Sequence, residues 1–441
     1  MRRLAAATAA LALIAALAVG SAALAEPAGS GLDPSYGEGG KVAVTQPPGA
    51  FIHYSSVREF ASARDGAVYV LGDGLIGACP SCRQVTSVIR IDSSGGFDPG
   101  FGGRAGVVLS SVAATGGEST RYQISADSQG RPLVSSSEGG AVTVRRFDLS
   151  GRPDASFGAA GVATVPCECA ISAVRVVPAQ GGRVLVEASR PLRGGEYTSR
   201  PGVRVTLTRL LPNGAPDPAF GRRGSASFSF PGLTRPTATA VSKRGAVLLG
   251  GSSPRLASLV YVVRVSARGR LDTRFDRAAS ASMRRLRALG EFPSLSSVLA
   301  RGDGTTELVG TSELTGGFDL RLRPNGRLAR GFAGRGLSVL PLPPQSATLG
   351  SGGAIFAATE APQVTVFRIL KNGRLDARFG GDAGIVAPLS GEGIVVGTQD
   401  GRRAVVMDVG YVFCRFGGCE NTPAIARYTE ADPAAGLADA A

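Results

Sequence analysis

Residues 31–42 read GLDPSYGEGGKV, and variants of this phrase return six more times along the chain. The second copy, GGFDPGFGGRAGVV, occupies residues 95–108, and the last, GRLDARFGGDAGIV, occupies residues 373–386. The copies follow one another at intervals of roughly 47 to 65 residues, and a repeat of this period is typical of solenoids, propellers and arrays. The repeat therefore decides the fold class before any single residue is considered.

Each repeat unit contains four short segments of alternating apolar and polar residues, separated by turns that contain glycine. In the first unit the segments REFASARDG, AVYVLGDG and TSVIRIDSSG precede the second phrase, and RAGVVLS ends it. Such segments predict β-strands. Glycine at the second central position, as in Asp65-Gly66 and Asn213-Gly214, suits tight hairpin turns that need a positive φ. Each unit is therefore expected to form a four-stranded antiparallel meander.

Four-stranded sheets repeated around an axis are the blades of a β-propeller. The chain has one lone outer strand near its start, residues 41–46, and only three inner strands at its end, within residues 393–429. If the first strand completes the last blade, the number of outer strands equals the number of inner three-strand groups, and two sheet edges are no longer exposed. We therefore predict an all-β fold, a seven-bladed β-propeller of four-stranded antiparallel blades whose ring is closed by the N-terminal strand completing the C-terminal blade. This single domain would span residues 26–430.

The two ends of the chain carry different signals. Residues 1–25 begin with Arg2 and Arg3, continue with an Ala/Leu-rich run and end in Ala-Leu-Ala, which predicts a secretory signal peptide cut after Ala25. A retained membrane anchor is the alternative, but no later segment has the roughly 18 unbroken apolar residues of a spanning helix. We expect a mature chain without a transmembrane segment that is secreted, extracellular or part of the cell envelope. Residues 431–441 would form a short flexible tail.

The six cysteines occur as close pairs, which fits an exported protein. The clustering favours local bridges, Cys79–Cys82 and Cys414–Cys419, although other pairings are possible in principle. Cys167 and Cys169 are two residues apart on an extended segment, which lies near the upper limit of disulfide reach. A zinc site built from these cysteines is disfavoured by export.

The formal net charge is +14, and arginine supplies nearly all of the positive charge, since lysine occurs only at positions 41, 243 and 371. This balance suits cell-wall or outer-surface polyanions as partners, and a general bias of the sequence toward arginine would explain it equally well. No basic block with interleaved aromatic residues is present, so no nucleic-acid partner is expected.

The phrase L-D-P-S-[YF]-G-x-G-G-[KR]-V, preceded by R-x-x-x-x-G-x-x-D spacing, resembles the delta-60 repeat family of bacterial β-propellers. The resemblance covers about residues 31–430 and implies a propeller and an exported or surface location, but no settled activity. The fifth copy departs from the pattern at Asp276, and the sixth departs at Ala329 and Ala333.

Three residue types recur at fixed places in the copies. An aspartate opens the core of six phrases: Asp33, Asp98, Asp154, Asp217, Asp272 and Asp376. An aromatic residue follows three positions later, and we interpret it as a packing wedge between neighbouring sheets. An arginine stands eight positions before the aspartate position: Arg90, Arg146, Arg209, Arg264, Arg321 and Arg368. We expect each arginine to form a structural pair with the aspartate, which also caps the turn. A ring of arginines that holds a polyanion is the weaker alternative, because the strands that carry them lie away from the channel.

Little in the sequence indicates catalysis. His53 is the only histidine, which excludes multi-histidine metal sites and leaves one residue for any catalytic triad. Neither a nucleophile elbow, a phosphate-binding loop nor the spacing of a calcium loop is present. We therefore assign no catalytic, cofactor-binding or metal-ligating residue and expect no cofactor. The alternative is an extracellular propeller hydrolase or lyase that uses loop acids on a polysaccharide.

Strand order divides the connections between two faces. The hairpin turns and the phrases lie on one face and are short, whereas the connections on the other face are longer and carry all six cysteines. Because binding residues commonly lie on variable loops held by a rigid scaffold, we expect the second face to bind an extracellular protein or glycan, with the protein acting as a monomeric, non-enzymatic scaffold. The candidate binding residues are His53, Arg284, Arg285, Arg287, Glu291 and Glu420.

Overall fold

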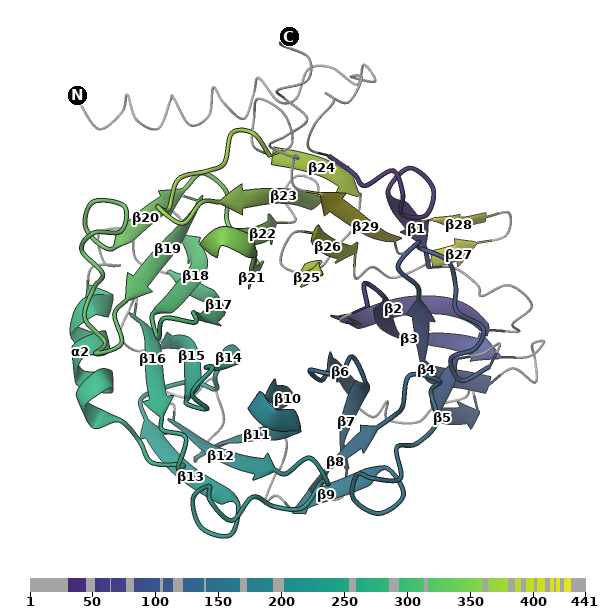
Figure 1. Cartoon of the computed structure of the whole chain (residues 1–441), viewed down its shortest axis with the longest axis horizontal. Coiled ribbons are helices and arrows are strands. Elements are labelled where there is room, and N and C mark those ends of the chain that lie inside the picture. The colour runs from purple at the N-terminus through teal and green to yellow at the C-terminus, as the bar shows by residue number, and fades with distance from the viewer. Residues whose placement is uncertain are drawn as a thin grey trace.

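The computed structural model shows an all-β propeller in which antiparallel sheets surround a central opening (Figure 1). The structure describes residues 31–44, 52–63, 65–76, 83–103, 106–113, 122–138, 140–166, 173–192, 202–253, 259–284, 293–312, 316–359, 364–379, 385–389, 394–399, 403–408, 413–415, 418–420 and 424–429. No helix within these ranges has the length and the apolar character that crossing a bilayer requires.

Five of the sheets consist of four strands that are consecutive in the chain, with the first strand nearest the opening. Sheet 1 contains β2 (Ile52–Ser62), β3 (Val68–Ile76), β4 (Arg83–Ile91) and β5 (Val107–Ala113). Sheet 2 contains β6 (Tyr122–Ala126), β7 (Pro132–Glu138), β8 (Ala141–Arg146) and β9 (Val162–Pro166). Sheet 3 contains β10 (Ala173–Ala179), β11 (Arg183–Pro191), β12 (Gly202–Leu210) and β13 (Ser225–Pro231).

Sheets 5 and 6 follow the same order. Sheet 5 contains β17 (Ser294–Ala300), β18 (Thr306–Ser312), β19 (Gly316–Leu322) and β20 (Leu337–Leu340). Sheet 6 contains β21 (Ser346–Leu349), β22 (Ile355–Thr359), β23 (Val364–Ile369) and β24 (Ile385–Leu389). Short 3₁₀ turns, Gln180–Gly182 and Ser351–Gly353, join the first two strands of sheets 3 and 6.

Sheet 7 combines the two ends of the chain. Its strands are β25 (Ile394–Gln399), β26 (Arg403–Asp408), β29 (Ala424–Thr429) and β1 (Lys41–Ala43), in that order. Lys41 pairs with Ala426, and Ala43 pairs with Ala424. The N-terminal strand thus supplies the outer edge of the C-terminal sheet. A separate hairpin, β27 (Phe413–Arg415) with β28 (Gly418–Glu420), branches from this sheet between β26 and β29.

Sheet 4 corrects the expectation of four strands in every unit, because it has only β14 (Ala238–Val241), β15 (Val247–Ser253) and β16 (Leu259–Val265). Helix α2 (Thr273–Met283) follows the phrase where a fourth strand was expected. In the first four copies the residue after the aromatic ring is a glycine with positive φ, such as Gly158, and in the sixth copy Ala333 takes a positive φ there; this residue turns the chain back toward the sheet. Asp276 occupies this position here and continues a helix whose N-terminus is capped by Asp272.

The core is divided among the junctions between consecutive sheets. Each of seven buried hydrophobic clusters combines side chains of two neighbouring sheets. The cluster around Phe60 and Val405, for example, joins sheet 1 to sheet 7. Strands in the middle of a sheet are therefore covered on both faces, and every residue of β22 is buried. The buried aromatic rings of the phrases lie at these junctions, where large rings contribute much apolar area.

Close approach between neighbouring phrases explains the glycine that opens the copies after the first, such as Gly151 and Gly214. A Cβ atom on Gly151 would lie 2.6 Å from the backbone nitrogen of Gly102 in the preceding phrase, and Gly214 has the same relation to Gly158. Both glycines also have positive φ values, which side chains disfavour. The repeated turns thus pack backbone against backbone around one face of the ring, which we call the short-turn face.

Candidate functional site

A repeated junction unit of arginine, aspartate and an aromatic ring connects the sheets on the short-turn face. In sheet 2, Arg146 Nε donates to Asp154 Oδ2 at 2.8 Å, and its guanidinium lies 4.5 Å from the centre of the Phe157 ring. Arg146 Nη1 also donates to the carbonyl of Pro212 in sheet 3 at 2.8 Å. The corresponding Arg–Asp pairs are Arg90–Asp98, Arg209–Asp217, Arg264–Asp272, Arg368–Asp376 and Arg427–Asp33.

The ionisation of these aspartates fits a structural role. Burial favours the protonated form of Asp154, but hydrogen bonds from Ser156 and the charge of Arg146 outweigh burial and lower the pKa of this carboxyl. The pKa values of Asp33 and Asp217 are lowered in the same way, against the effect of burial. The aspartates therefore remain charged and bound to their arginines, which hold neighbouring sheets together.

Sheet 5 contains a different version of this unit. Ala329 occupies the aspartate position, and Arg321 Nε instead donates to Glu307 Oε1 at 2.7 Å. Glu307 belongs to the neighbouring strand β18, is fully buried and also accepts a hydrogen bond from Arg301. In sheets 2, 3 and 4 the residue that pairs with the arginine across the strands is leucine: Leu133, Leu185 and Leu248. In sheet 5 the carboxylate has therefore moved from the phrase into the sheet.

A second acid accompanies this change. Asp319 lies two residues before Arg321 on β19 and is fully buried, and its two carboxyl oxygens accept no hydrogen bond from the described residues. Burial, with the nearby charge of Glu307, raises the pKa of Asp319 well above its usual range, against the effect of Arg321 and Arg301. The protonated form is thus favoured, and two arginines share the one charge of Glu307.

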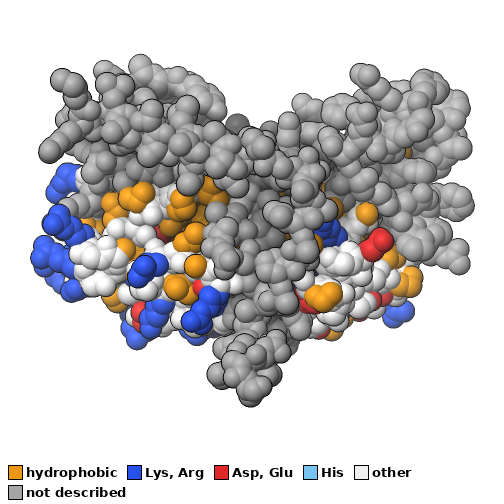
Figure 2. All heavy atoms as spheres, turned by 90° about the horizontal axis from the view of Figure 1, so that it is seen from above, with side chains coloured by type: hydrophobic (Ala, Val, Ile, Leu, Met, Phe, Trp, Pro, Cys, Tyr) orange, Lys and Arg blue, Asp and Glu red, His pale blue; other side chains and the backbone are white. Residues whose placement is uncertain are grey.

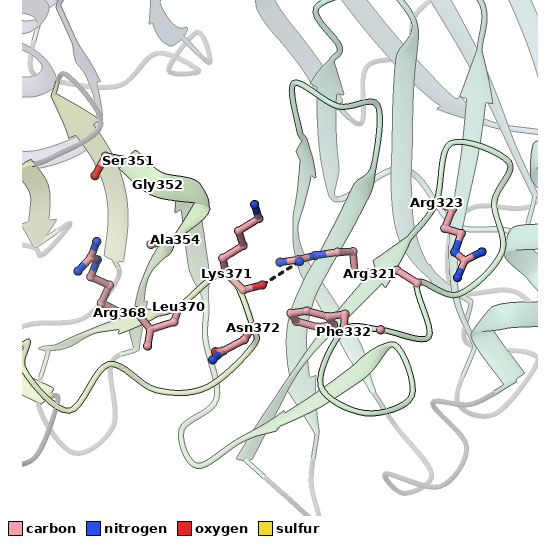
Figure 3. Close-up of a pocket in the computed structure, with 12 residues that line it drawn as sticks. Arg321, Arg323, Phe332, Ser351, Gly352, Ala354, Arg368, Leu370, Lys371 and Asn372 are labelled. Atoms are coloured by element: carbon pink, nitrogen blue, oxygen red, sulfur yellow. Dashed lines mark hydrogen bonds between the residues drawn. The ribbon is translucent and has the colours of Figure 1, made fainter.

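An open hollow of about 610 Å³ lies beside Ala329, between sheets 5 and 6. We call it the sheet 5–6 hollow, and its basic lining residues are Arg321, Arg323, Arg368 and Lys371. Figure 3 shows Arg321 reaching toward the Lys371 carbonyl, with the Phe332 ring beside it and Arg368 on the other side of the hollow. Arg321 Nη1 donates to that carbonyl at 2.8 Å, so this bond fixes the backbone of Lys371 next to Arg321.

A second hollow, of about 940 Å³, lies beside the helix that replaces the fourth strand of sheet 4. We call it the α2 hollow, and its basic lining residues are Arg274, Arg277, Arg323, Arg327 and Arg330. Arg274 and Arg277 lie in the first turns of α2, whereas the other three come from the neighbouring phrase of sheet 5. Arg323 lines both hollows, so the two hollows are adjacent.

Together the hollows form a basic face, defined by Arg274, Arg277, Arg321, Arg323, Arg327, Arg330, Arg368 and Lys371. No acidic residue of the described part of the chain lines either hollow. Lys and Arg side chains gather at the left side of Figure 2, the side on which Figure 1 places α2 and β20. Six of the eight residues are exposed, and only Arg321 and Arg368 are half-buried. A surface of this kind is suited to anions.

The structure describes few of the residues that we expect to bind a ligand on the opposite face. Arg285, Arg287, Glu291 and the four cysteines 79, 82, 167 and 169 lie outside the described residues. His53 is placed in β2 and Glu420 in β28, but their side chains lie outside the described part as well. Arg284 is exposed directly after α2. Cys414 and Cys419 are paired across the β27–β28 hairpin, with their side chains again outside the described part.

Two further acids near the channel bear on the enzymatic alternative. Glu187 on β11 is fully buried and accepts a hydrogen bond from the Thr239 hydroxyl of the next sheet, while Arg175 lies 4.0 Å away and donates to the carbonyl of Pro236. Glu59 on β2 accepts from the backbone N–H of Ile124 at 3.0 Å, and burial raises its pKa to about 7. Both acids bond to the neighbouring sheet, so we interpret them as structural rather than catalytic.

The basic face was not predicted from the sequence, but signals for it are present. Residues 321–330 read RLRPNGRLAR, with four arginines in ten positions, and α2 adds Arg274 and Arg277. The acids Glu307 and Asp319 interrupt strand positions that are aliphatic in sheets 2, 3 and 4. An alignment of the copies strand by strand would have revealed these departures.

Comparisons with known proteins add only distant similarities. No protein-family model matches the chain, and no curated protein matches it. Among solved structures, prolyl oligopeptidase B from Galerina marginata is similar over 85% of this chain and 49% of its own, with 10% identity and a TM-score of 0.48. A protein of unknown function from Bacteroides caccae is similar over 72% of this chain and 97% of its own, with 14% identity and a TM-score of 0.34.

The PQQ-bound aldose sugar dehydrogenase from Streptomyces coelicolor is similar over 92% of this chain and 99% of its own, with 12% identity and a TM-score of 0.34. The chain thus spans about half the length of the oligopeptidase and nearly the full length of the other two proteins. At these identities and TM-scores the similarities carry no argument about activity, so the functional argument rests on the geometry of this chain.

Proposed function

We propose that this protein is an exported, non-enzymatic propeller that binds an acidic glycan through the basic face. In this proposal sheets 1 to 7 act as seven blades, and β1 closes the ring by completing the last one. The N-terminal signal-peptide pattern and the delta-60 resemblance support export, and the net charge of +14 supports an anionic partner outside the cell.

One observation carries the proposal: among the residues that the structure describes, two adjacent hollows are lined by eight basic side chains and by no acidic one. The nearest repeated acids on this face are already engaged. Asp272 pairs with Arg264, Asp376 pairs with Arg368, and Asp303 accepts from Thr305. The exposed arginines of the basic face therefore remain available to an external anion, and planar guanidinium groups suit carboxylate and sulfate groups.

The same lining favours binding over catalysis. Glycoside cleavage by the usual mechanism needs a pair of carboxyl groups at the bond that breaks, and the described lining of the two hollows contains none. The lining also favours a glycan over single-stranded nucleic acid, whose bases stack on aromatic rings. Phe332 is the only aromatic residue among the lining residues, and its side chain is buried.

The proposal is tested by titrating the chain without residues 1–25 with polygalacturonate, dextran sulfate and neutral dextran. We expect the two acidic polymers to bind and the neutral one not to bind, with affinity falling as salt screens the exposed charges. Replacing Arg323, Arg327 and Arg330 together by alanine should weaken binding about tenfold, since exposed charge pairs contribute roughly 0.2–1 kcal/mol each.

The matched control replaces Arg152, Arg222 and Arg223, which are equally exposed but line neither hollow, by alanine. We expect this control to weaken binding less than about twofold. Equal losses in both triple variants would show unspecific charge attraction and overturn the assigned face. Preferential binding of duplex DNA would overturn the ligand class, and shortening of either polymer would favour the hydrolase or lyase alternative.

A further inference from the structure

We infer that the sheet 5–6 hollow is a subsite for a single anionic group of the ligand, a carboxylate or a sulfate. This group takes the place of the aspartate that the repeat pattern would put at position 329. This inference rests on the proposed function for the identity of the ligand, and it names the residues that recognise it. Arg321 and Lys371 are the two positions at which the group is held, with Arg368 on the facing side.

The first support is the missing carboxylate. In the five other copies that form a regular turn, an aspartate of the phrase binds the arginine of its own sheet: Asp33, Asp98, Asp154, Asp217 and Asp376. Asp272 binds Arg264 in the same way at the start of α2. Ala329 has no side-chain oxygen, and it lines the hollow directly. Among the described phrases, only that of sheet 5 thus lacks a carboxylate that accepts a hydrogen bond from the arginine of its own sheet.

The second support is an added cation in the same hollow. The residue three positions after the repeated arginine presents its carbonyl to the arginine of the preceding sheet. It is Ser93, Pro212, Ala267 and Pro324 in sheets 1, 3, 4 and 5, but Lys371 in sheet 6. The Lys371 side chain is exposed and makes no ion pair with a described residue. The loss of an anion at position 329 and the gain of a cation at position 371 therefore occur on the two sides of one hollow.

The third support is the charge balance behind the hollow. Each ordinary junction pairs its arginine with a carboxylate of its own phrase, as Arg146 pairs with Asp154. In sheet 5, Glu307 is shared between Arg301 and Arg321 and is fully buried within the sheet. Asp217 of sheet 3 is also shared by two arginines, Arg183 and Arg209, but it belongs to the phrase. In sheet 5 no phrase carboxylate balances the positive charge of Arg321, so an anion entering the hollow would meet this charge there.

The inference is tested by restoring the pattern of the repeat. Ala329→Asp would place a carboxylate where the other copies have one, so it would occupy the subsite from within the protein. We expect this variant to melt within a few degrees of the unchanged protein and to bind polygalacturonate and dextran sulfate about five- to tenfold more weakly, which corresponds to losing one charge-assisted contact. Ala219→Asp, in the exposed part of the sheet 3 phrase, adds the same charge as a matched control and should change affinity less than about twofold.

A second variant keeps the inference falsifiable if Ala329→Asp fails to fold. Lys371→Ala installs the residue that sheet 4 has at this position, Ala267, on an exposed side chain that makes no described ion pair. We expect it to fold normally and to weaken binding of the same two polymers about threefold or more.

The outcomes separate this inference from the proposed function. If the unchanged protein binds neither acidic polymer, the proposed function fails. If it binds them but Ala329→Asp and Lys371→Ala bind as tightly as the unchanged protein, the subsite is wrong and the proposed function stands. Weaker binding of polygalacturonate alone identifies the group as a carboxylate, and weaker binding of dextran sulfate alone identifies it as a sulfate.

Discussion

The hollow between sheets 3 and 4 and the sheet 5–6 hollow occupy the same place in the repeat, but they differ in size and charge. The first measures about 210 Å³ and the second about 610 Å³. At the first, Asp217 Oδ2 lies 3.1 Å from Arg183 Nε and 2.8 Å from Arg209 Nε. At the second, two arginines again share one carboxylate, but Glu307 supplies it from inside the sheet. Placing the carboxylate on β18 instead of on the phrase thus keeps both arginines paired and leaves the hollow open to an external anion.

The largest effect is expected from removing the relocated carboxylate. Glu307→Leu copies Leu185 of sheet 3 and leaves the buried Arg301 and the half-buried Arg321 without their shared partner. We expect a loss of about 3 to 5 kcal/mol in the free energy of unfolding, measured with urea, because an uncompensated buried charge is costly.

The double variant Glu307→Leu with Ala329→Asp serves as the control for this experiment. It restores the arrangement of sheet 3, with the carboxylate on the phrase, and should recover at least half of the lost stability. No recovery in the double variant would show that the two positions are not interchangeable sources of the same carboxylate.

A somewhat smaller effect is expected from the reverse change in sheet 3. Asp217→Ala reproduces Ala329 in a sheet that has Leu185 rather than an acid on its second strand. Arg209 is then left without its partner, and we expect a loss of about 2 to 3 kcal/mol in urea unfolding. A loss below about 0.5 kcal/mol would contradict the view that the junction pairs hold neighbouring sheets together.

The next effect concerns Asp319, whose pKa is raised by burial and by Glu307. A carboxyl with a higher pKa in the folded state than in the unfolded state stabilises the protein while it is protonated, so this contribution is lost as the pH rises above the unfolded pKa. Asp319→Leu copies Leu207 of sheet 3 and removes this dependence. At neutral pH we expect the variant to be more stable by about 1 to 3 kcal/mol, the usual cost of an unsatisfied buried polar group.

The measurement is urea unfolding at several pH values between 4 and 8. The difference in stability between Asp319→Leu and the unchanged protein should grow with rising pH. A difference that stays constant across this range would show that Asp319 does not change its ionisation on folding.

The smallest effect is expected from adding the lysine of sheet 6 to sheet 4. Ala267→Lys places a cation beside the hollow between sheets 3 and 4, where Asp217 still occupies the phrase. We expect less than about a twofold change in the affinity for polygalacturonate, because the internal carboxylate continues to compete with the ligand. A gain as large as the loss in Lys371→Ala would show that the lysine alone makes a subsite.

The sequence contained enough information for the propeller arrangement, because the repeat of the phrase fixed both the turns and the order of the strands. The pairing of β1 with β29 follows from the same count. Sheet 4 was predicted incorrectly, since the departure at Asp276 was recognised as a change of turn but not as the start of a helix. The missing glycine alone does not decide this, because Ala333 takes a positive φ at the same position in sheet 5 and the chain there continues into β20. In sheet 4 the Asp276 side chain instead accepts from the backbone N–H of Arg264, and the alanine-rich segment continues as α2.

The basic face was less accessible to sequence reasoning. The short-turn face looked uniform, because its phrases and turns are nearly identical from copy to copy. Whether Ala329 leaves Arg321 without a carboxylate depends on the register of β18 against β19, which places Glu307 opposite Arg321. Such cross-strand pairs are fixed by the three-dimensional pairing and not by the spacing within one copy.

The most direct test of the whole account is a crystal structure of the protein with an oligogalacturonate bound. We expect one carboxylate of the ligand within hydrogen-bond distance of Arg321 or Lys371, with the neighbouring sugars extending over Arg323 toward the α2 hollow. A ligand bound on the opposite face, or in the central opening, would contradict the account.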